Sequence, residues 1–255
     1  MMDFTVKIYK ELLKSLISQN YAFQTFDEYI SNPSEKAIIL RHDVDLKPQN
    51  SLAFARIQNK LGIRGVYYFR AVAESWDEEV INEIHSLGHE IGYHYESLTT
   101  CSGNFQEAID DFADNLTCLR RLAPVSTICM HGSPLSKYDS KDLWKIYDYR
   151  DFGVVGEPYF DVNFNKVFYM TDTGRKWDGE KVSVRDKVET VFKLSFTSTN
   201  QLIKASNHNQ LPNQIMFTFH PQRWSDNKCS WMKEYLLQNI KNMIKRVLII
   251  TLRVK

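Results

Sequence analysis

Residues 37–45 read Ala37-Ile38-Ile39-Leu40-Arg41-His42-Asp43-Val44-Asp45, a short apolar run that ends in charged side chains. The turn residues Asn32-Pro33-Ser34 precede the run, and together they predict a buried strand. Polar residues gathered at the end of a strand indicate a site. Because residues two apart on a strand point to the same face, we expect Asp43 and Asp45 to project together.

Two neighbouring carboxylates are stable together only where a cation lies near them, since each otherwise raises the pKa of the other. The pair formed by Asp43 and Asp45 therefore suits a metal ligand beside a general base. The alternative is a structural role for one of the two, as a helix N-cap or in a loop salt bridge.

Strands and helices alternate regularly around this segment. Such alternation is typical of parallel strands joined by right-handed crossovers, in a barrel or in a doubly wound sheet. The predicted helices cover residues 6–19, 50–61, 77–87, 105–122 and a segment from 231 onward. The predicted strands cover residues 37–40, 65–69, 89–95, 126–130, 153–155, 167–170 and 215–219, and a last strand around 247–251 is left open.

Composition and length narrow the class of protein. A chain of 255 residues suits one α/β barrel, so we expect a single domain over residues 1–255, with a leading helix and connector at 1–35 packed on the barrel. Lys and Arg (32) nearly balance Asp and Glu (31), which argues against nucleic acid as a partner. Residues 1–7 lack the basic start of a secretory signal and no apolar run is long enough to span a bilayer, so we expect no transmembrane segment and a cytoplasmic location.

Polar residues recur after other predicted strands. His94 and Glu96 share one face at the end of the third strand, His131 follows the fourth, and His220 follows a late one. In parallel α/β folds the carboxyl ends of the strands form the ligand-binding rim, so the recurrence indicates one site. For any single histidine a structural hydrogen-bonding role is the alternative, and we expect that role for His42 and His89.

Taken in order, three motifs resemble those of the polysaccharide deacetylase (NodB-type, carbohydrate esterase) family, across about residues 36–224. They are Arg41-His42-Asp43-Val44-Asp45, Gly88-His89-Glu90-Ile91-Gly92-Tyr93-His94 and Phe219-His220-Pro221. The resemblance implies a distorted (β/α) barrel and the removal of an acetyl group from a sugar with a divalent metal, usually zinc. By position it implies that Asp43 is the general base, that Asp45 and His94 are metal ligands, and that His220 is the general acid.

The chain departs from the family pattern at the second metal histidine, where it has Leu98. His131 is the first choice for the missing ligand, because it lies where the family has a functional strand-end motif, and Glu96 is the second. Residues 169–178 are nearest to a further family motif. As substrate-binding residues we expect Glu96, Arg175 and Trp177, with Arg175 paired with a carboxylate and Trp177 offering a sugar-stacking face. The alternative is a loop held by an Asp172–Arg175 contact with Trp177 buried.

The leading hypothesis is therefore a zinc-dependent carbohydrate deacetylase acting on an intracellular precursor of a surface polysaccharide. A catalytically silent glycan-binding barrel is the second hypothesis, and Leu98 supports it. A metal-independent amide hydrolase of allantoinase-like type on the same barrel is the third. The sequence does not indicate the oligomeric state.

Overall fold

The computed structural model describes residues 2–133, 136–177 and 187–253, and its centre is a parallel β-sheet. The hydrogen-bonded path runs β5-β4-β3-β2-β7-β6, and β1 pairs with β2 off this path. The strands are β1 (Ala22–Gln24), β2 (Ala37–Val44), β3 (Val66–Phe69), β4 (Glu90–Tyr95), β5 (Ile128–Met130), β6 (Phe168–Thr171) and β7 (Gln214–Phe219). In the described ranges no ladder joins β5 to β6, so the distorted (β/α) barrel that the sequence predicts is present in an open form.

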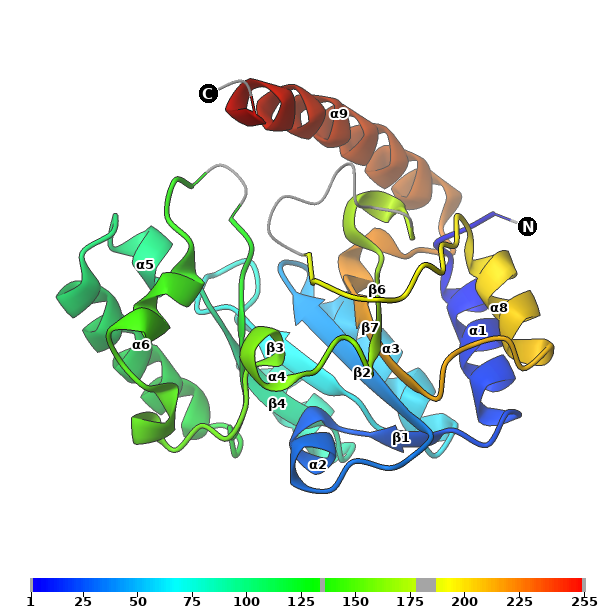
Figure 1. Ribbon diagram of the computed structural model, residues 1–255, viewed down its shortest axis with the longest axis horizontal. Helices are drawn as coiled ribbons and strands as arrows, with labels where there is room; N and C mark the ends of the chain where they lie inside the picture. Colours follow the sequence, from blue (N-terminus) through cyan, green and yellow to red (C-terminus); the bar gives the residue numbers. More distant parts are fainter. Residues whose placement is uncertain (1, 134–135, 178–186, 254–255) are drawn as a thin grey trace.

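Helices connect the strands and cover the sheet (Figure 1). The α-helices are α1 (Val6–Ile17), α2 (Phe26–Ser31), α3 (Pro48–Lys60), α4 (Glu78–Ser86), α5 (Ser97–Thr100), α6 (Phe105–Arg120), α7 (Pro158–Asp161), α8 (Thr199–Asn207) and α9 (Lys228–Arg253). Short 3₁₀ helices are η1 (Ser140–Lys145), η2 (Tyr149–Phe152), η3 (Thr173–Arg175) and η5 (Pro221–Arg223). Because the strands are all parallel, their carboxyl ends lie at one edge of the sheet, where the loops that follow them meet.

Both faces of β2 are buried, as is usual for a strand in a parallel sheet covered on both sides. Ile38 and Leu40 belong to the larger hydrophobic cluster, which also contains the buried residues of α1, α3, α4 and α6. Ile39, between them, belongs to a smaller cluster with Tyr68 and Met216 on the other face. This alternation places His42 on the side of α1 and α3, and Asp43 on the opposite side.

One expected strand, and another that the sequence left open, are absent from the described residues. At 153–155, Gly153 has a φ of 69° and follows η2, and only Gly156 bridges Thr127. At 247–251 the chain remains helical, because α9 runs to Arg253 through a segment without Gly or Pro to stop it. The described elements that were not predicted are β1, α2, α5, α7 and α8, together with the four short 3₁₀ helices.

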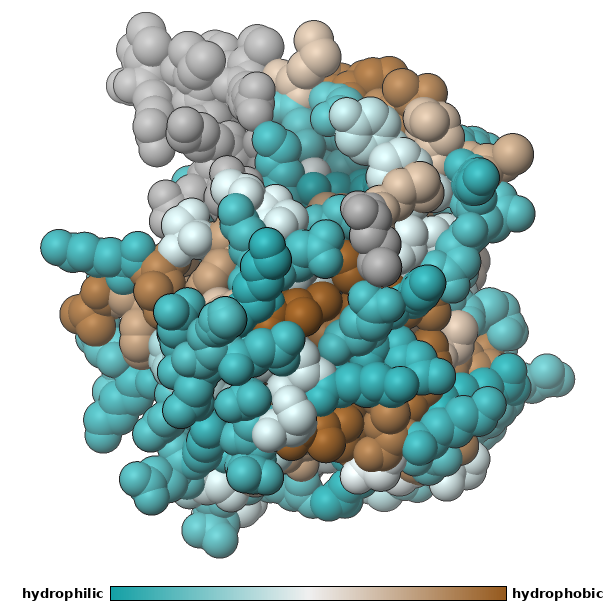
Figure 2. Space-filling model, turned by 90° about the vertical axis from the view of Figure 1, so that its right-hand side faces the viewer, coloured by the Kyte–Doolittle hydropathy of each residue, from teal (hydrophilic) through white to brown (hydrophobic). Residues whose placement is uncertain are grey.

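The α9 helix exposes more large hydrophobic side chains than any other described element. It crosses the top of the molecule in Figure 1, and hydrophobic side chains gather at the top of Figure 2. Among the described residues, no helix combines the length and the apolar character that crossing a membrane requires.

Candidate functional site

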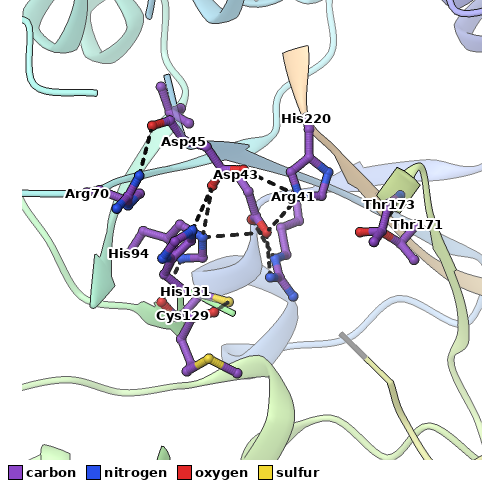
Figure 3. Close-up of polar contacts among 12 residues, drawn as sticks. Arg41, Asp43, Asp45, Arg70, His94, Cys129, His131, Thr171, Thr173 and His220 are labelled. Carbon is purple, nitrogen blue, oxygen red and sulfur yellow. Dashed lines mark hydrogen bonds and ion pairs between the residues drawn. The ribbon is translucent and has the colours of Figure 1, made fainter. Parts of the chain in front are cut away.

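Five of the predicted site residues converge at the carboxyl edge of the sheet (Figure 3). Each comes from the end of a parallel strand, because the strands all terminate on this side. The residues are Asp43 in β2, Asp45 directly after it, His94 in β4, His131 after β5 and His220 after β7.

The Nε2 atoms of the three histidines face the two carboxylates at distances beyond a hydrogen bond. His94 Nε2 lies 3.7 Å from Asp43 Oδ2 and 3.6 Å from Asp45 Oδ1. His131 Nε2 lies 3.6 Å from the same Asp45 Oδ1. His220 Nε2 lies 3.9 Å from Asp43 Oδ2 and 3.8 Å from Asp45 Oδ2. The space among these atoms is therefore polar on every side.

The opposite ring nitrogen of each histidine, Nδ1, is held by an acceptor. The acceptors are Cys129 O at 2.8 Å for His94, Glu96 Oε2 at 2.8 Å for His131 and Asp172 Oδ1 at 2.6 Å for His220. Carbonyl and carboxylate oxygens only accept, so each Nδ1 carries the hydrogen and Nε2 is the ring nitrogen that faces the site. This is the arrangement that orients histidine ligands in metal sites.

Asp45 has an unsatisfied oxygen at the centre of this arrangement. Its Oδ2 accepts from Gln222 Nε2 at 3.1 Å, whereas its buried Oδ1 has no hydrogen-bond partner among the described residues. A buried carboxylate oxygen without a donor is costly, and a cation would satisfy it. Ligand atoms of Asp45, His94 and His131 all lie within 4.8 Å of one another.

The donor set of Asp45, His94 and His131 suits zinc in both chemistry and spacing. Imidazole nitrogen and carboxylate oxygen are common zinc ligands, and tetrahedral coordination at bond lengths of about 2.0–2.1 Å separates two ligand atoms by about 3.3 Å. The separations of 3.6 Å from Asp45 Oδ1 to His94 and to His131 are close to that value. A site of three protein ligands leaves a coordination position open, as catalytic zinc sites do.

Arg41 holds the second carboxylate, that of Asp43. Its Nε and Nη2 donate to the two Asp43 oxygens at 2.8 and 2.7 Å, and both side chains are buried. Burial by itself would raise the pKa of Asp43, but Arg41 and His94 outweigh it and the pKa lies below its usual range. Asp43 is therefore ionised, although little water reaches it.

His94 and Asp45 each shift the pKa of the other toward its charged form. Burial by itself would lower the pKa of His94, yet Asp43 and Asp45 raise it. Burial by itself would raise the pKa of Asp45, yet His94, His220 and His131 bring it well below the usual value. The cluster therefore favours positive charge between the carboxylates, whether from a proton or from a metal ion.

Glu96 lies behind His131 and does not face the cluster. Arg70 donates to its Oε1 at 2.8 Å, and His131 Nδ1 lies 2.8 Å from its Oε2. Burial by itself would raise the pKa of Glu96, but His131 and Arg70 lower it to about 2. Of the two candidates for the third ligand, His131 thus faces Asp45 and Glu96 orients His131.

Asp172, at the end of β6, is a functional candidate that the sequence analysis did not select. Besides His220 Nδ1, it accepts from the indole Nε1 of Trp224 at 2.6 Å and from Arg223 at 3.2 Å. It is fully buried. Its position follows from the pairing of Thr171 with Thr218, which sets the end of β6 beside the residues that follow β7. Arg41 was also missed, although the period-two spacing to Asp43 was a usable signal.

Arg175 and Trp177 contact other groups than the sequence analysis first expected. Arg175 stacks on the ring of Trp231 at 4.6 Å and donates to its carbonyl at 3.0 Å, and among the described residues it forms no ion pair. Trp177 is 4% exposed and donates to Thr199 Oγ1, so its ring faces the core rather than a sugar. Trp177 thus matches the alternative in which its ring is buried, and the pairing of Arg175 with a carboxylate stays a prediction.

Leu98 also belongs to the core, with 2% exposure in α5. Its backbone position is thus part of the packing behind the site. His131 approaches Asp45 from the end of a different strand, β5.

Neither a protein-family model nor a curated protein matches the sequence. Among solved structures, the chain is similar to a CE4 esterase from Streptococcus mutans, with 14% identity, 86% of this chain and 85% of that chain covered, and a TM-score of 0.45. It is also similar to a family 4 carbohydrate esterase from Bacillus anthracis, with 10% identity, coverage of 95% and 89%, and a TM-score of 0.41. A CE4 family pseudoenzyme from Bacillus anthracis is 12% identical, with coverage of 84% and 63% and a TM-score of 0.40. None of these similarities bears on the chemistry of the site, which has to be inferred from its side chains.

Proposed function

We propose that this protein is a metal-dependent hydrolase that removes an acetyl or similar acyl group from a carbohydrate. Asp45, His94 and His131 would hold the divalent metal, with zinc as the first choice. The observation that carries the proposal is the buried Asp45 Oδ1, which has no donor among the described residues and faces two imidazole Nε2 atoms at 3.6 Å. Carbohydrate as the substrate rests on the motif resemblance of residues 36–224, and an intracellular precursor of a surface polysaccharide stays a prediction.

Asp43 is suited to be the general base. A metal bound at the site would supply Lewis acidity, which activates a water molecule and polarises the acyl oxygen. Asp43 is placed to accept a proton from a water molecule through Oδ2, the oxygen that faces the site. Arg41 keeps Asp43 ionised and fixes its two oxygens, so the base is oriented before the substrate arrives.

His220 is suited to be the general acid. Its Nε2 faces the cluster, and Asp172 anchors its Nδ1 at 2.6 Å. A carboxylate at Nδ1 stabilises the imidazolium form, which can release a proton from Nε2 to the departing amine or alkoxide. Asp172 is thus a positioning residue for the acid, as Arg41 is for the base.

The proposal is tested by metal content and by acetate release measured on the same preparations. After reconstitution with zinc, the wild-type protein is expected to hold stoichiometric metal and to release acetate from a panel of N-acetylated and O-acetylated oligosaccharides. Asp45→Ala should lose both properties, because it removes the central ligand. Asp151→Ala, which removes an exposed carboxylate outside the site, is the matched control and should keep both.

Two results would overturn the proposal. Persistent absence of metal after reconstitution, with no turnover, would favour the silent glycan-binding barrel that Leu98 suggests. Hydrolysis of a small amide without metal, unaffected by Asp45→Ala, would favour an allantoinase-like hydrolase.

A further inference from the structure

The α9 helix carries an apolar face that points away from the protein. Among the described residues, thirteen large hydrophobic side chains are exposed, and seven of them lie on this helix. They are Met232, Tyr235, Leu236, Leu237, Ile240, Met243 and Ile244, with exposed fractions from 43% to 67%. Figure 2 shows the hydrophobic surface at the top of the molecule, where Figure 1 places α9.

The inward face of the same helix is polar. Gln238 and Asn242 are 5% and 4% exposed, and Gln238 Nε2 donates to Asn242 Oδ1 at 2.9 Å. Asn242 Nδ2 donates in turn to the carbonyl of Gly174, also at 2.9 Å. A helix on the surface of a globular protein normally buries its apolar side and exposes its polar side. In α9 this order is reversed, which marks an interaction surface.

We propose that a second copy of this chain covers this apolar face, with the two α9 helices packed antiparallel about a two-fold axis near residue 238. Met232, Leu236, Ile240 and Ile244 form a ridge with a spacing of four residues, the kind of ridge that packs into the grooves of a second helix. A two-fold axis near residue 238 sets Leu236 opposite Ile240 of the partner copy, and Met232 opposite Ile244. Every position of the ridge then meets an apolar residue, as a self-complementary interface requires.

Area and charge both fit this occupant. Tyr235 stacks on Trp231 and lies on the same side of the helix as Asn242, so six side chains remain on the outward face. At about 100 Å² each they offer roughly 600 Å² per copy, about three quarters of the ~800 Å² that each partner of a standard interface buries. Lys233 is the charged residue nearest the middle of the outward face. In the antiparallel pair it lies opposite Met243, so the two lysines stay ten residues apart, or about 15 Å along the helices. Like charges therefore do not oppose one another.

Single substitutions at the centre of the face test the interface. By sedimentation velocity at rising concentration, the full-length wild-type chain is expected to dimerise. Leu236→Glu or Ile240→Lys should weaken dimerisation by roughly 100-fold, because each places a charge in the apolar centre. Ile146→Lys, at a residue 61% exposed outside α9, is the matched control and should still dimerise. Circular dichroism of each variant should match the wild type, since the altered side chains point to solvent in the monomer.

Mixing the two single variants tests the antiparallel arrangement. Glu at 236 then faces Lys at 240 of the other copy, so Leu236→Glu and Ile240→Lys should associate more tightly when mixed than either variant does alone. A wild-type chain that stays monomeric at every concentration would overturn the proposal, and its co-sedimentation with anionic vesicles would assign the face to a membrane surface instead. A wild-type dimer with no association of the mixed variants would overturn the two-fold pairing.

Discussion

Two groups of histidines, all buried except the half-buried His131, lie on different sides of the sheet and differ in how they use their ring nitrogens. His42 and His89 lie toward the helices, and each has a partner at both nitrogens. The partners are Val66 O and Gln58 Nε2 for His42, and Gly65 N and Ala55 O for His89. At the carboxyl edge, His94, His131 and His220 each have a partner at Nδ1 and only distant carboxylates at Nε2.

The difference shows that burial alone does not mark a functional histidine. Burial lowers the pKa of His42 to about 3 and that of His89 to about 4, so both rings are neutral and complete the core, as the sequence analysis expected. At the edge, the second nitrogen is left for a ligand.

The largest effect is expected at the carboxylate that faces the edge histidines. Asp43→Asn should lower turnover by about 10²–10⁴-fold while zinc content stays unchanged, because an amide cannot accept the proton from water. Steady-state kinetics measure the turnover, and elemental analysis of the same preparation measures the zinc content. His42→Asn, one residue away on the other face of the strand, should change the free energy of unfolding and leave turnover within a few-fold of the wild-type value. Full activity of Asp43→Asn would rule out its role as the base.

The next largest effect is expected on zinc affinity, in which a variant of the edge histidine His131 should differ from a variant of the core histidine His89. His131→Ala should weaken zinc binding by more than about 100-fold, since it removes a direct ligand rather than a supporting group. His89→Ala should leave the affinity unchanged, because its ring already has two protein partners. Competition with a chromophoric chelator measures both variants. Equal affinity of His131→Ala and wild type would show that the third ligand lies elsewhere.

A smaller effect is expected at the group that orients His131. Glu96→Gln should weaken zinc binding by about 10–100-fold, because an amide holds the Nδ1 hydrogen less strongly than a carboxylate. The same chelator competition measures it. A larger loss for Glu96→Gln than for His131→Ala would reverse the two roles and make Glu96 the ligand.

The smallest effect concerns acid stability and the core histidines. Unfolded His89 takes up a proton below about pH 6.5, whereas the buried ring does so only near its pKa of about 4. The free energy of unfolding that depends on His89 is therefore complete above about pH 6.5 and falls as the pH decreases toward 4. Relative to His89→Gln, the wild type should lose about 2 kcal/mol between about pH 7 and about pH 5. Urea unfolding at both pH values checks this, and a constant difference between the two proteins would contradict it.

Much of the sheet could be predicted because its signals are local. Apolar runs mark β2, β3, β4 and β7, and Gly62 and Gly88, both at positive φ, end the turns before β3 and β4. The strand expected at 153–155 failed because an apolar Val-Val pair follows Gly153, whose left-handed backbone belongs to a turn. The strand considered at 247–251 failed because β-branched residues are also compatible with the end of a long helix.

The site was predictable only in part, for a related reason. Parallel strand ends meet at one edge, so Asp43, Asp45, His94 and His220 could be brought together from the strand pattern. The partner of His220 could not, because Asp172 reaches it through the register of β6 on β7, and register between distant strands leaves no local signal. Trp177 was misplaced because a tryptophan in a loop has the same sequence signature whether it faces the core or a ligand.

If His131 is the third metal ligand, as proposed, the position of β5 has a mechanical consequence. β5 is three residues long and lies at the end of the hydrogen-bonded path, beside β4, and His131 follows it directly with its N–H donated to Tyr95 O at 2.8 Å. Zinc bound as proposed would cross-link this edge to the central strand β2 through Asp45. Amide hydrogen exchange at Met130 and His131 would then be slow in the loaded protein and accelerate when a chelator removes the ion.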